Sequence, residues 1–428
     1  MDICITPQAL GGTVSIPSSK SIGHRDLICA ALADGESIVE NISISQDIEA
    51  TCRVLQAFGA VIERIPSAYT GRAAYRVIGG LKPQTQPVTA DCCESGSTLR
   101  FLIPVGMLND QTVTFMGQGK LPKRPLDPYY QIFTDHHIPY TLTDGGLPMT
   151  VQGKLQPGHY ALAGNVSSQF FTGLLLTLPL LDGDSVLEST TTLESLSYVT
   201  MTLDCMARHG VQVQWDGKNT FHIPGNQSYQ AGTYTVEGDY SQAAFWLSAG
   251  LLGNPITCMG LRQHSSQGDE AIVTILQNMD GTIVGNDSRI QAQPSTMIGT
   301  TIDVEDCPDL VPVLAVVASC SEGVTYITHA ARVRLKECDR LHAMAVELNK
   351  IGARIEEEPE GLIIHGVSGF TGGTVDGWND HRVAMALAVA SQRCQSPLTI
   401  TGASCVRKSY PTFWEDFALL GGQCEQKG

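Results

Sequence analysis

The 428-residue sequence has little charge, fewer basic than acidic residues and no long apolar run. Charged residues make up 16% of it, and 27 Lys and Arg face 43 Asp and Glu, for a formal net charge of −16. Binding to the phosphate backbone of nucleic acids needs a broad basic face on the protein, so this composition argues against a nucleic-acid-binding protein. No run approaches the roughly 18 apolar residues of a membrane span, and the start MDICITPQAL lacks a basic region before an apolar core.

Metal-binding and disulfide patterns are missing as well. The 13 cysteines are an odd number scattered along the chain, with no CxxC motif and no Cys/His cluster at metal-ligand spacing. Free thiols are typical of a reducing compartment, so we expect a cytoplasmic protein with no metal or organic cofactor. The length exceeds what one core usually supports, which predicts two domains.

One local pattern recurs along the chain: a helical apolar stretch that ends near Gly and passes into an alternating, strand-like run. It occurs at Gly59, Gly210, Gly281, Gly352 and Gly421, with a degenerate copy near His136. From Gly210 onward the spacing is 71, 71 and 69 residues, and Gly59 precedes Gly210 by 151, about two such intervals. Chance recurrence in an α/β protein would give less regular spacing. Six units of about 70 residues, three in each of two domains, are predicted.

Basic residues nevertheless gather in short tracts. The run RVRLKECDR packs Arg332, Arg334, Lys336 and Arg340 around two carboxylates. Such a run suits either a solvated helix face with ion pairs or a site for anions. The net negative charge of the chain favours small anionic ligands over nucleic acid.

Three predicted helices begin with small hydroxyl residues. They are PSSKSIGHRDLICAALADG, ESGSTLRFLIPVG and NVSSQFFTGLLLTLPL. Capping alone explains such openings. The first two also carry Lys20, Arg25 and Arg100, and a helix N-terminus favours a phosphate or carboxylate, so the three openings are candidate anion sites.

These segments resemble, in order, the signatures of the 5-enolpyruvylshikimate-3-phosphate synthase family. The matching tracts are PSSKSIGHR, ESGSTLR, KLPKRPLDP, NVSSQF, LESLSYVTMTL, VEGDYSQAAFWL, PDL, RLKECDRL, NDHRVAMALA and RKSYPTF. The resemblance covers essentially the whole chain. It implies transfer of the enolpyruvyl group of phosphoenolpyruvate to the 5-hydroxyl of shikimate 3-phosphate, with release of phosphate, through a tetrahedral intermediate.

The resemblance also implies a fold. We expect an α/β (α+β) protein, a two-domain inside-out α/β barrel in which each domain has three copies of a βαβαββ unit. Residues 1–18 and 239–428 are expected to form the domain with both termini and the phosphoenolpyruvate-side cations. Residues 19–238 are expected to form the shikimate 3-phosphate side, with the active site in the interdomain cleft. A monomer is expected.

Matching positions supply the expected site. Catalysis is assigned to Asp309, Glu337, Lys20 and His381. Phosphoenolpyruvate binding is assigned to Lys20, Gly96, Arg124, Gln169, Arg340, Arg382 and Lys408. Shikimate 3-phosphate binding is assigned to Lys20, Ser21, Arg25, Ser167, Ser168, Gln169, Ser195, Tyr198, Asp309 and Lys336. The two substrates bring about four anionic groups, which explains the number of cations.

Addition and elimination need one group for the hydroxyl proton and another for the methylene carbon. Asp309 is assigned to the hydroxyl, Glu337 to the methylene carbon and Lys20 to the leaving phosphate, while His381 is a relay or a structural histidine satisfied by Asp380. A carboxyl beside Lys336 and Arg340 should have a lowered pKa unless burial opposes it, which is unfavourable for Glu337 as a proton donor.

Three positions depart from the family pattern, with Glu94 and Arg332 at common Asn positions and Ser18 at a usual Gly. Two other functions fit parts of the sequence. A sister enolpyruvyl transferase acts on UDP-N-acetylglucosamine, but it usually carries KN where this chain has Lys20 and Ser21, and a loop cysteine that GQGKLPKRP lacks. A non-catalytic sensor of a phosphorylated metabolite would not need Asp309, Glu337 and His381 together.

Overall fold

The chain forms two compact units, one built from two segments of the sequence and the other from a single continuous segment. The computed structural model describes residues 1–69, 71–82, 84–286 and 289–427. Met1–Ser18 and Glu237–Gly428 form the first unit, and Ser19–Val236 form the second. The second crossover therefore falls at Glu237, two residues before the expected position at Asp239.

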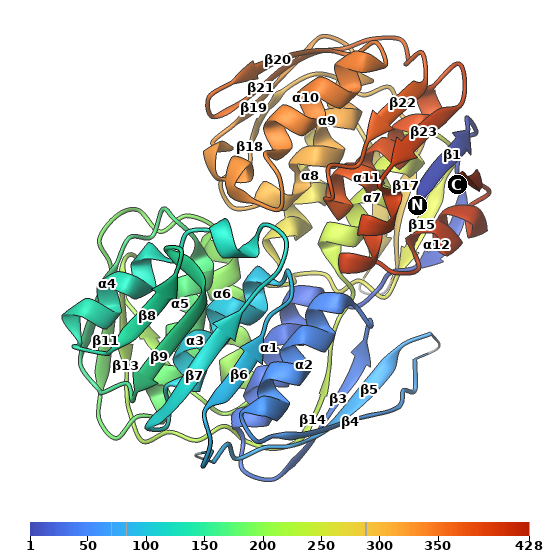
Figure 1. Ribbon diagram of the computed structural model, residues 1–428. Coiled ribbons are helices and arrows are strands. Elements are labelled where there is room, and N and C mark those ends of the chain that lie inside the picture. Colours follow the sequence, from blue (N-terminus) through green and yellow to red (C-terminus); the bar gives the residue numbers. More distant parts are fainter. Residues whose placement is uncertain (70, 83, 287–288, 428) are drawn as a thin grey trace. The chain divides into compact units, whose positions relative to one another are not determined.

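The described residues form six four-stranded sheets, three in each unit, and all six share one pairing pattern (Figure 1). In each sheet the strand pair at one end is parallel, and the other two pairs are antiparallel. The expected architecture of three βαβαββ copies in each unit is thereby confirmed.

The first unit closes around both ends of the chain. Its first copy contains β2 (Gly12–Ser15), α7 (Tyr240–Leu252), β15 (Ile256–Met259), α8 (Ala271–Asn278), β16 (Thr282–Asn286) and β17 (Arg289–Gln293). Its second contains β18 (Thr301–Asp303), α9 (Val311–Ser319), β19 (Val324–Thr328), α10 (Arg340–Lys350), β20 (Arg354–Glu358) and β21 (Gly361–His365). Its third contains β22 (Gly373–Asp376), α11 (His381–Ala390), β23 (Leu398–Thr401), α12 (Phe413–Leu419), β24 (Gln423–Lys427) and β1 (Asp2–Thr6).

The second unit is built the same way. Its first copy contains β14 (Thr233–Thr235), α1 (Lys20–Leu32), β3 (Glu36–Ile42), α2 (Gln46–Ala57), β4 (Val61–Pro66) and β5 (Ala73–Ile78). Its second contains β6 (Val88–Asp91), α3 (Gly96–Gly106), β7 (Gln111–Met116), α4 (Asp127–Asp135), β8 (Tyr140–Thr143) and β9 (Gly146–Gly153). Its third contains β10 (His159–Leu162), α5 (Ser168–Thr177), β11 (Ser185–Ser189), α6 (Leu196–Arg208), β12 (Gln214–Trp215) and β13 (Thr220–Ile223).

The helix-to-strand corner predicted from glycine spacing is present in all six copies. Each corner has a backbone hydrogen bond from an N–H to the carbonyl five residues earlier, which terminates the helix. The donor and acceptor pairs are Ala60 with Leu55, Ile138 with Phe133, Val211 with Met206, Gly281 with Leu276, Ala353 with Leu348, and Gly422 with Phe417.

Two corners differ in which residue takes the left-handed conformation. Gly352 has a φ of +98°, but at the Gly281 corner the left-handed residue is Asp280, with a φ of +64°. His137 takes this role in the degenerate copy, with a φ of +54°. Gly281 therefore corresponds to Ala353, not to Gly352, and the predicted corner position is wrong by one residue in this copy.

Apolar helices lie at the centre of each unit, and the sheets surround them. In the first unit α7, α9 and α11 contact one another. Figure 1 shows α9 and α11 between the sheet of β18–β21 and the sheet that includes β22 and β23. Every residue of α9 and of α11 is buried. Both helices consist mainly of small and apolar residues, so they have no polar face that must contact water.

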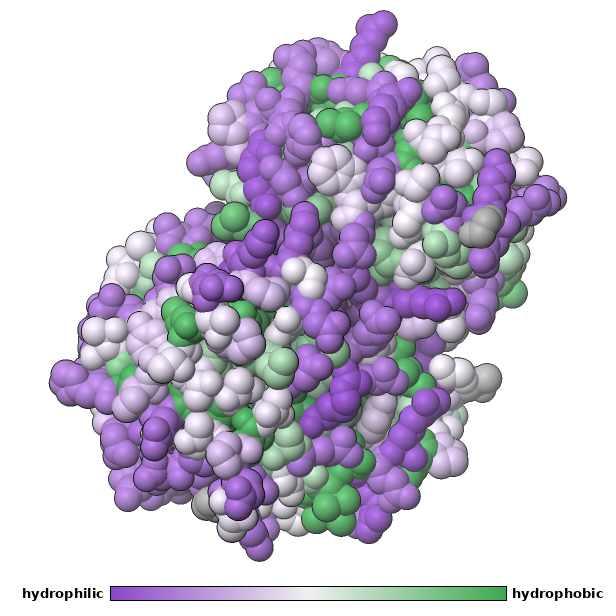
Figure 2. All heavy atoms as spheres, viewed as in Figure 1, coloured by the Kyte–Doolittle hydropathy of each residue, from purple (hydrophilic) through white to green (hydrophobic). Residues whose placement is uncertain are grey.

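The visible surface is mainly hydrophilic, and hydrophobic residues form small separate areas on it (Figure 2). Among the described residues, no helix has the length and apolar character needed to cross a membrane. All thirteen cysteines are free thiols.

Replacing Gly352 with Ala tests the corner geometry. The nearest atom to an added Cβ, Thr371 Cγ2, lies 3.6 Å away, so the cost is one of backbone conformation. We expect the free energy of unfolding to fall by about 1–2 kcal/mol in urea titrations. The matched change Asp280→Gly relieves a similar strain and should alter stability by less than about 1 kcal/mol. Equal losses in both variants would contradict this account.

Candidate active site

In the first unit, Asp309 is the centre of a cluster of cations. It lies in a short 3-10 helix, Pro308–Leu310, that directly precedes α9. One of its oxygens, Oδ1, lies 2.8 Å from Arg340 Nη1 and 3.3 Å from Lys336 Nζ. Its other oxygen, Oδ2, accepts a hydrogen bond of 2.9 Å from Arg382 Nη2. Residues separated by up to 73 positions are thus brought to one carboxylate.

Arg340 joins three carboxylates. It is the first residue of α10, and its side chain is only 1% exposed. Besides Asp309, it donates to Glu337 Oε2 at 2.7 Å and to Asp380 Oδ2 at 2.8 Å. Asp380 caps α11 and accepts from the Arg382 backbone N–H at 2.9 Å. The run RVRLKECDR is therefore partly buried, and its cations do not simply face solvent.

The pKa shifts in this cluster reflect two opposing effects. Burial by itself would raise the pKa of Asp309, but Arg382, Lys336 and Arg340 outweigh it and hold that pKa well below its usual value. Burial lowers the pKa of Lys336, and Asp309 opposes that shift. Burial likewise opposes ionisation of Asp380, yet Arg340 keeps its pKa lowered. Asp309 is thus an anion held by three cations.

The other first-unit residues predicted from the sequence lie on neighbouring elements. His381 is the first residue of α11 and is buried, and a positive charge on it would lower the pKa of both Asp309 and Asp380. Lys408 ends the 3-10 helix Ala403–Lys408 and donates to the Asn379 carbonyl at 2.9 Å, just before Asp380. Arg334 pairs with Asp339 at 2.8 Å, so these two residues of the run neutralise each other.

In the second unit, Lys20 opens α1 and is held by an acidic residue that the sequence argument missed. Lys20 Nζ lies 2.7 Å from Asp47 Oδ2, and both side chains are 16% exposed. Asp47 belongs to the first turn of α2, and its backbone carbonyl accepts from Thr98 of α3 at 3.3 Å. The charge of Lys20 is therefore fixed where the first turns of α1, α2 and α3 meet.

Gly96 and Arg124 lie against each other. Gly96 begins α3, and a Cβ added there would lie 2.5 Å from Arg124 Nη1. Arg100, in the next turn of α3, donates to Gln169 Oε1 at 2.8 Å and to the Pro125 carbonyl at 3.0 Å. Gln169 in turn donates to Ser97 at 3.0 Å. Arg100 thus positions Gln169 and the chain beside Arg124, although it was not assigned to either substrate.

The predicted serines occupy helix openings. Ser167 caps α5 and accepts from the Gln169 N–H at 3.3 Å, and Ser168 is the first residue of that helix. Ser195 immediately precedes α6 with a φ of +52°, and Tyr198 is in its first turn. Ser21 is the second residue of α1. Four helix openings in this unit, those of α1, α3, α5 and α6, therefore carry predicted ligand residues, a geometry that suits anions.

Arg25 links three of these helices. It is 2% exposed and donates to Ser21 O at 2.8 Å, to Thr202 Oγ1 at 2.8 Å and to Tyr198 O at 3.0 Å. Its guanidinium group also lies 5.0 Å from the centre of the Phe101 ring. Arg25 was predicted to bind shikimate 3-phosphate, and in the structure its guanidinium group holds α1 and α6 together.

The structure shows the contacts of the three residues that depart from the family pattern, Glu94, Arg332 and Ser18. Glu94 lies beside Gly119, where an added Cβ would be 2.8 Å from Glu94 Oε2, on the loop that leads to Arg124. Arg332 donates to the Glu305 carbonyl at 3.1 Å, and Ser18 is buried and bridges to Gly238.

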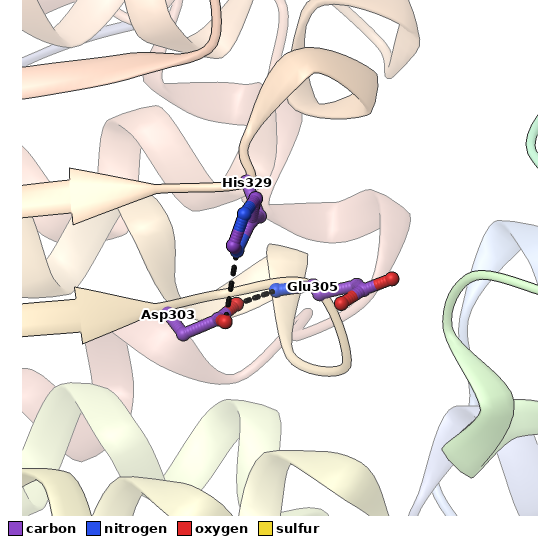
Figure 3. A group of neighbouring side chains, drawn as sticks. All are labelled: Asp303, Glu305 and His329. Carbon is purple, nitrogen blue, oxygen red and sulfur yellow. Dashed lines mark hydrogen bonds and ion pairs between the residues drawn. The ribbon is translucent and has the colours of Figure 1, made fainter.

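The described residues contain one group of three side chains able to surround a metal ion, namely Asp303, Glu305 and His329 (Figure 3). The group is on the surface of the first unit. His329 Nδ1 lies 2.8 Å from Asp303 Oδ2, and the Glu305 backbone N–H donates to Asp303 Oδ1 at 3.0 Å. The hydrogen bond to Asp303 raises the pKa of His329, so the contact is that of a surface ion pair.

Known proteins resemble this chain over its full length. A family profile described as EPSP synthase (3-phosphoshikimate 1-carboxyvinyltransferase) matches residues 5–417. A protein of Clostridium kluyveri named 3-phosphoshikimate 1-carboxyvinyltransferase is 50% identical over 424 residues, covering 99% of this chain and 98% of the relative. A protein of the same name from Clostridium acetobutylicum is 48% identical over 423 residues, covering 99% and 98%.

Solved structures agree on the fold. An EPSP synthase structure from Acinetobacter baumannii superposes with a TM-score of 0.83 at 24% identity, covering 99% of this chain and 100% of the other. The enolpyruvyl transferase NikO from Streptomyces tendae gives a TM-score of 0.80 at 17% identity, covering 100% and 98%. With its fold, its six copies and its sequence relatives in agreement, the chain belongs to the EPSP synthase family.

Proposed function

We propose that this protein transfers the enolpyruvyl group of phosphoenolpyruvate to the 5-hydroxyl of shikimate 3-phosphate and releases inorganic phosphate. It is a transferase of the shikimate pathway, the route to aromatic amino acids, as its relatives' names imply. The observation that carries the proposal is the grouping of Lys336, Arg340 and Arg382 on Asp309. Such a cluster suits a reaction between anionic partners that also needs a base.

The proposed reaction has two stages. In the first, the 5-hydroxyl loses its proton, its oxygen bonds to C2 of phosphoenolpyruvate, and C3 gains a proton. In the second, C3 loses a proton and the C2–O bond to phosphate breaks, which regenerates the double bond and releases phosphate. Asp309 accepts the hydroxyl proton. Glu337 exchanges the proton with the methylene carbon C3, and Lys20 stabilises the charge of the leaving phosphate.

Charge competition explains how strongly paired carboxylates can take part. A carboxylate held by three cations is a weak base, and Glu337 is held at 2.7 Å by Arg340. An anionic substrate that binds Arg340 or Arg382 offsets part of their charge, so the pKa of Asp309 rises and the ion pair of Glu337 with Arg340 weakens. The two carboxyl groups become suited to proton transfer only when substrate is present.

Both units supply residues to this reaction. We assign phosphoenolpyruvate to Lys20, Gly96, Arg124, Gln169, Arg340, Arg382 and Lys408, and shikimate 3-phosphate to Lys20, Ser21, Arg25, Ser167, Ser168, Gln169, Ser195, Tyr198, Asp309 and Lys336. His381 is assigned a relay role beside Asp309 and Asp380. Arg25 has the weakest claim to contact substrate directly, because its guanidinium group already donates hydrogen bonds to Thr202 and Tyr198 of α6.

The same proposal includes a cellular setting. Thirteen free thiols and a net charge of −16 favour a cytoplasmic enzyme that binds no nucleic acid. We propose that it works as a monomer.

Phosphate release is the direct test of the reaction. The purified protein should release phosphate from phosphoenolpyruvate only when shikimate 3-phosphate is added. Turnover with UDP-N-acetylglucosamine instead would assign the protein to the sister reaction. Binding of both ligands without turnover would support a sensor.

Asp309→Asn should separate chemistry from binding. Loss of the proton acceptor should lower kcat by about 10²- to 10⁴-fold. Calorimetry should still detect shikimate 3-phosphate binding to the variant. Asp303→Asn is the matched control, since it removes an exposed carboxylate of the same unit and should leave kcat within about twofold. A normal kcat in Asp309→Asn would remove this residue from the mechanism.

Gly96→Ala should act on one substrate. The added methyl group would meet the Arg124 guanidinium group at 2.5 Å and push it aside. We expect the KM for phosphoenolpyruvate to rise at least about tenfold, the size of one displaced charged hydrogen bond. The KM for shikimate 3-phosphate in the same assays is the internal control and should change by less than about twofold. A uniform rise in both constants would argue against a specific Arg124 contact.

A further inference from the structure

A buried carboxyl group outside the predicted site lies close to it. Asp269 belongs to the 3-10 helix Gly268–Glu270, which precedes α8, and is 4% exposed. Its Oδ2 accepts a hydrogen bond from the Ser241 hydroxyl of α7. Its Oδ1 is buried and has no hydrogen-bond partner among the described residues. A buried ionised carboxylate with one bare oxygen is costly, whereas a protonated one is much less so.

The elements packed around Asp269 include those that hold the proposed site residues Asp309 and Arg382. The helix α7 contacts the segments of Asp269, of Asp309 and of Arg382, namely Gly268–Glu270, Pro308–Leu310 and α11. The titratable or charged groups facing this region are Asp239, which caps α7, and Glu270, Cys307, Asp309 and Arg382. Arg382 is the cation among them, and it also donates to Asp309.

Asp269 and Asp309 are driven to opposite protonation states. Burial, followed by the charge of Asp309, raises the pKa of Asp269 to about 7, against the smaller effects of Arg382 and Ser241. The cations around Asp309 lower its pKa well below the usual value. Two neighbouring carboxyl groups whose pKa values are separated in this way can hold one proton and one negative charge between them.

We propose that Asp269 is a positioning residue that holds a proton while phosphoenolpyruvate binds, so that Arg382 offers its charge to the substrate and not to a second carboxylate. This inference rests on the proposed function and deepens it. Lys336, Arg340 and Arg382 already face three carboxylates, those of Asp309, Glu337 and Asp380. An ionised Asp269 would add a fourth negative charge to a cluster that must receive an anion.

The sign of the pH effect follows directly. Below about pH 7 Asp269 is neutral, and above it the ionised group competes with the substrate for Arg382. The KM for phosphoenolpyruvate should therefore rise with pH, while kcat changes less. One added negative charge near Arg382 corresponds to a rise in this KM of about three- to tenfold.

Asp269→Asn tests the proposal, since the amide is a neutral replacement of nearly the same shape. We expect the ratio of wild-type to variant KM for phosphoenolpyruvate to increase about three- to tenfold between pH 6 and pH 8.5. The same substrate is used for both proteins, so its own ionisation cancels in the ratio. A ratio that stays constant over this range would overturn the proposal. Glu425→Gln, which removes an exposed carboxylate of the same unit, is the control and should show a constant ratio.

A second variant moves the transition without removing the carboxyl group. The Ser241 hydrogen bond stabilises ionised Asp269, so Ser241→Ala should shift the rise in KM to higher pH. A shift to lower pH would contradict the proposal.

Unfolding in urea gives a readout that needs no activity. A carboxyl group whose folded pKa lies near 7, above its unfolded value, loses its stabilising contribution as pH rises toward 7. The wild-type midpoint should fall relative to Asp269→Asn between pH 5 and pH 7 and stay level above. Parallel midpoints would show that Asp269 is already ionised and would overturn the proposal. If the wild type released no phosphate with shikimate 3-phosphate, the proposed function would fail, and this measurement would still report on the proton.

Discussion

The buried guanidinium group of Arg340 is the contact on which the first unit's site depends. It joins Asp309, Glu337 and Asp380, which come from three different segments. A buried cation of this kind is stable only with its partners, so loss of any one carboxylate leaves charge uncompensated. The same arrangement keeps Asp309 ionised, and in the proposed reaction an incoming anion weakens the hold of the cations on it. Stability and reactivity are thus set by one group of charges.

The repeated fold explains why these residues can meet. In every copy the helices follow strands at the same end of a four-stranded sheet, and the central helices of each unit pack on one another. Helix openings carry many of the proposed ligand residues, as with Lys20, Gly96 and Ser168 in the second unit and Arg340 and His381 in the first. Unpaired backbone N–H groups and the helix dipole add to the side-chain charges there. Repetition therefore produces several anion-favouring ends from one local design.

Much of the site could be predicted because it lies in short, distinctive tracts. The run RVRLKECDR and the Lys20 segment carry clustered charge that is unusual in this acidic chain. What could not be predicted were partners distant in sequence, such as Asp47 for Lys20 and Asp269 beside Asp309. Arg100 had a signal, because it stands in the same tract as Gly96, yet only its bonds to Gln169 and Pro125 show what it does. The role of Arg25 was also undecidable from its tract, since its partners Thr202 and Tyr198 are over 170 residues away.

By itself, the sequence determined the six-copy architecture and the family, and it supplied the charged residues that we propose for the site. Glycine positions and helix openings depend on residues close together in the sequence, so they can be recognised from the sequence alone. Only the tertiary structure decided which residue turns each corner, as Asp280 and His137 show, and which charges neutralise one another. Protonation is decided at the same level, because the pKa of a carboxyl group depends on burial and on neighbours that the chain brings together only when it folds.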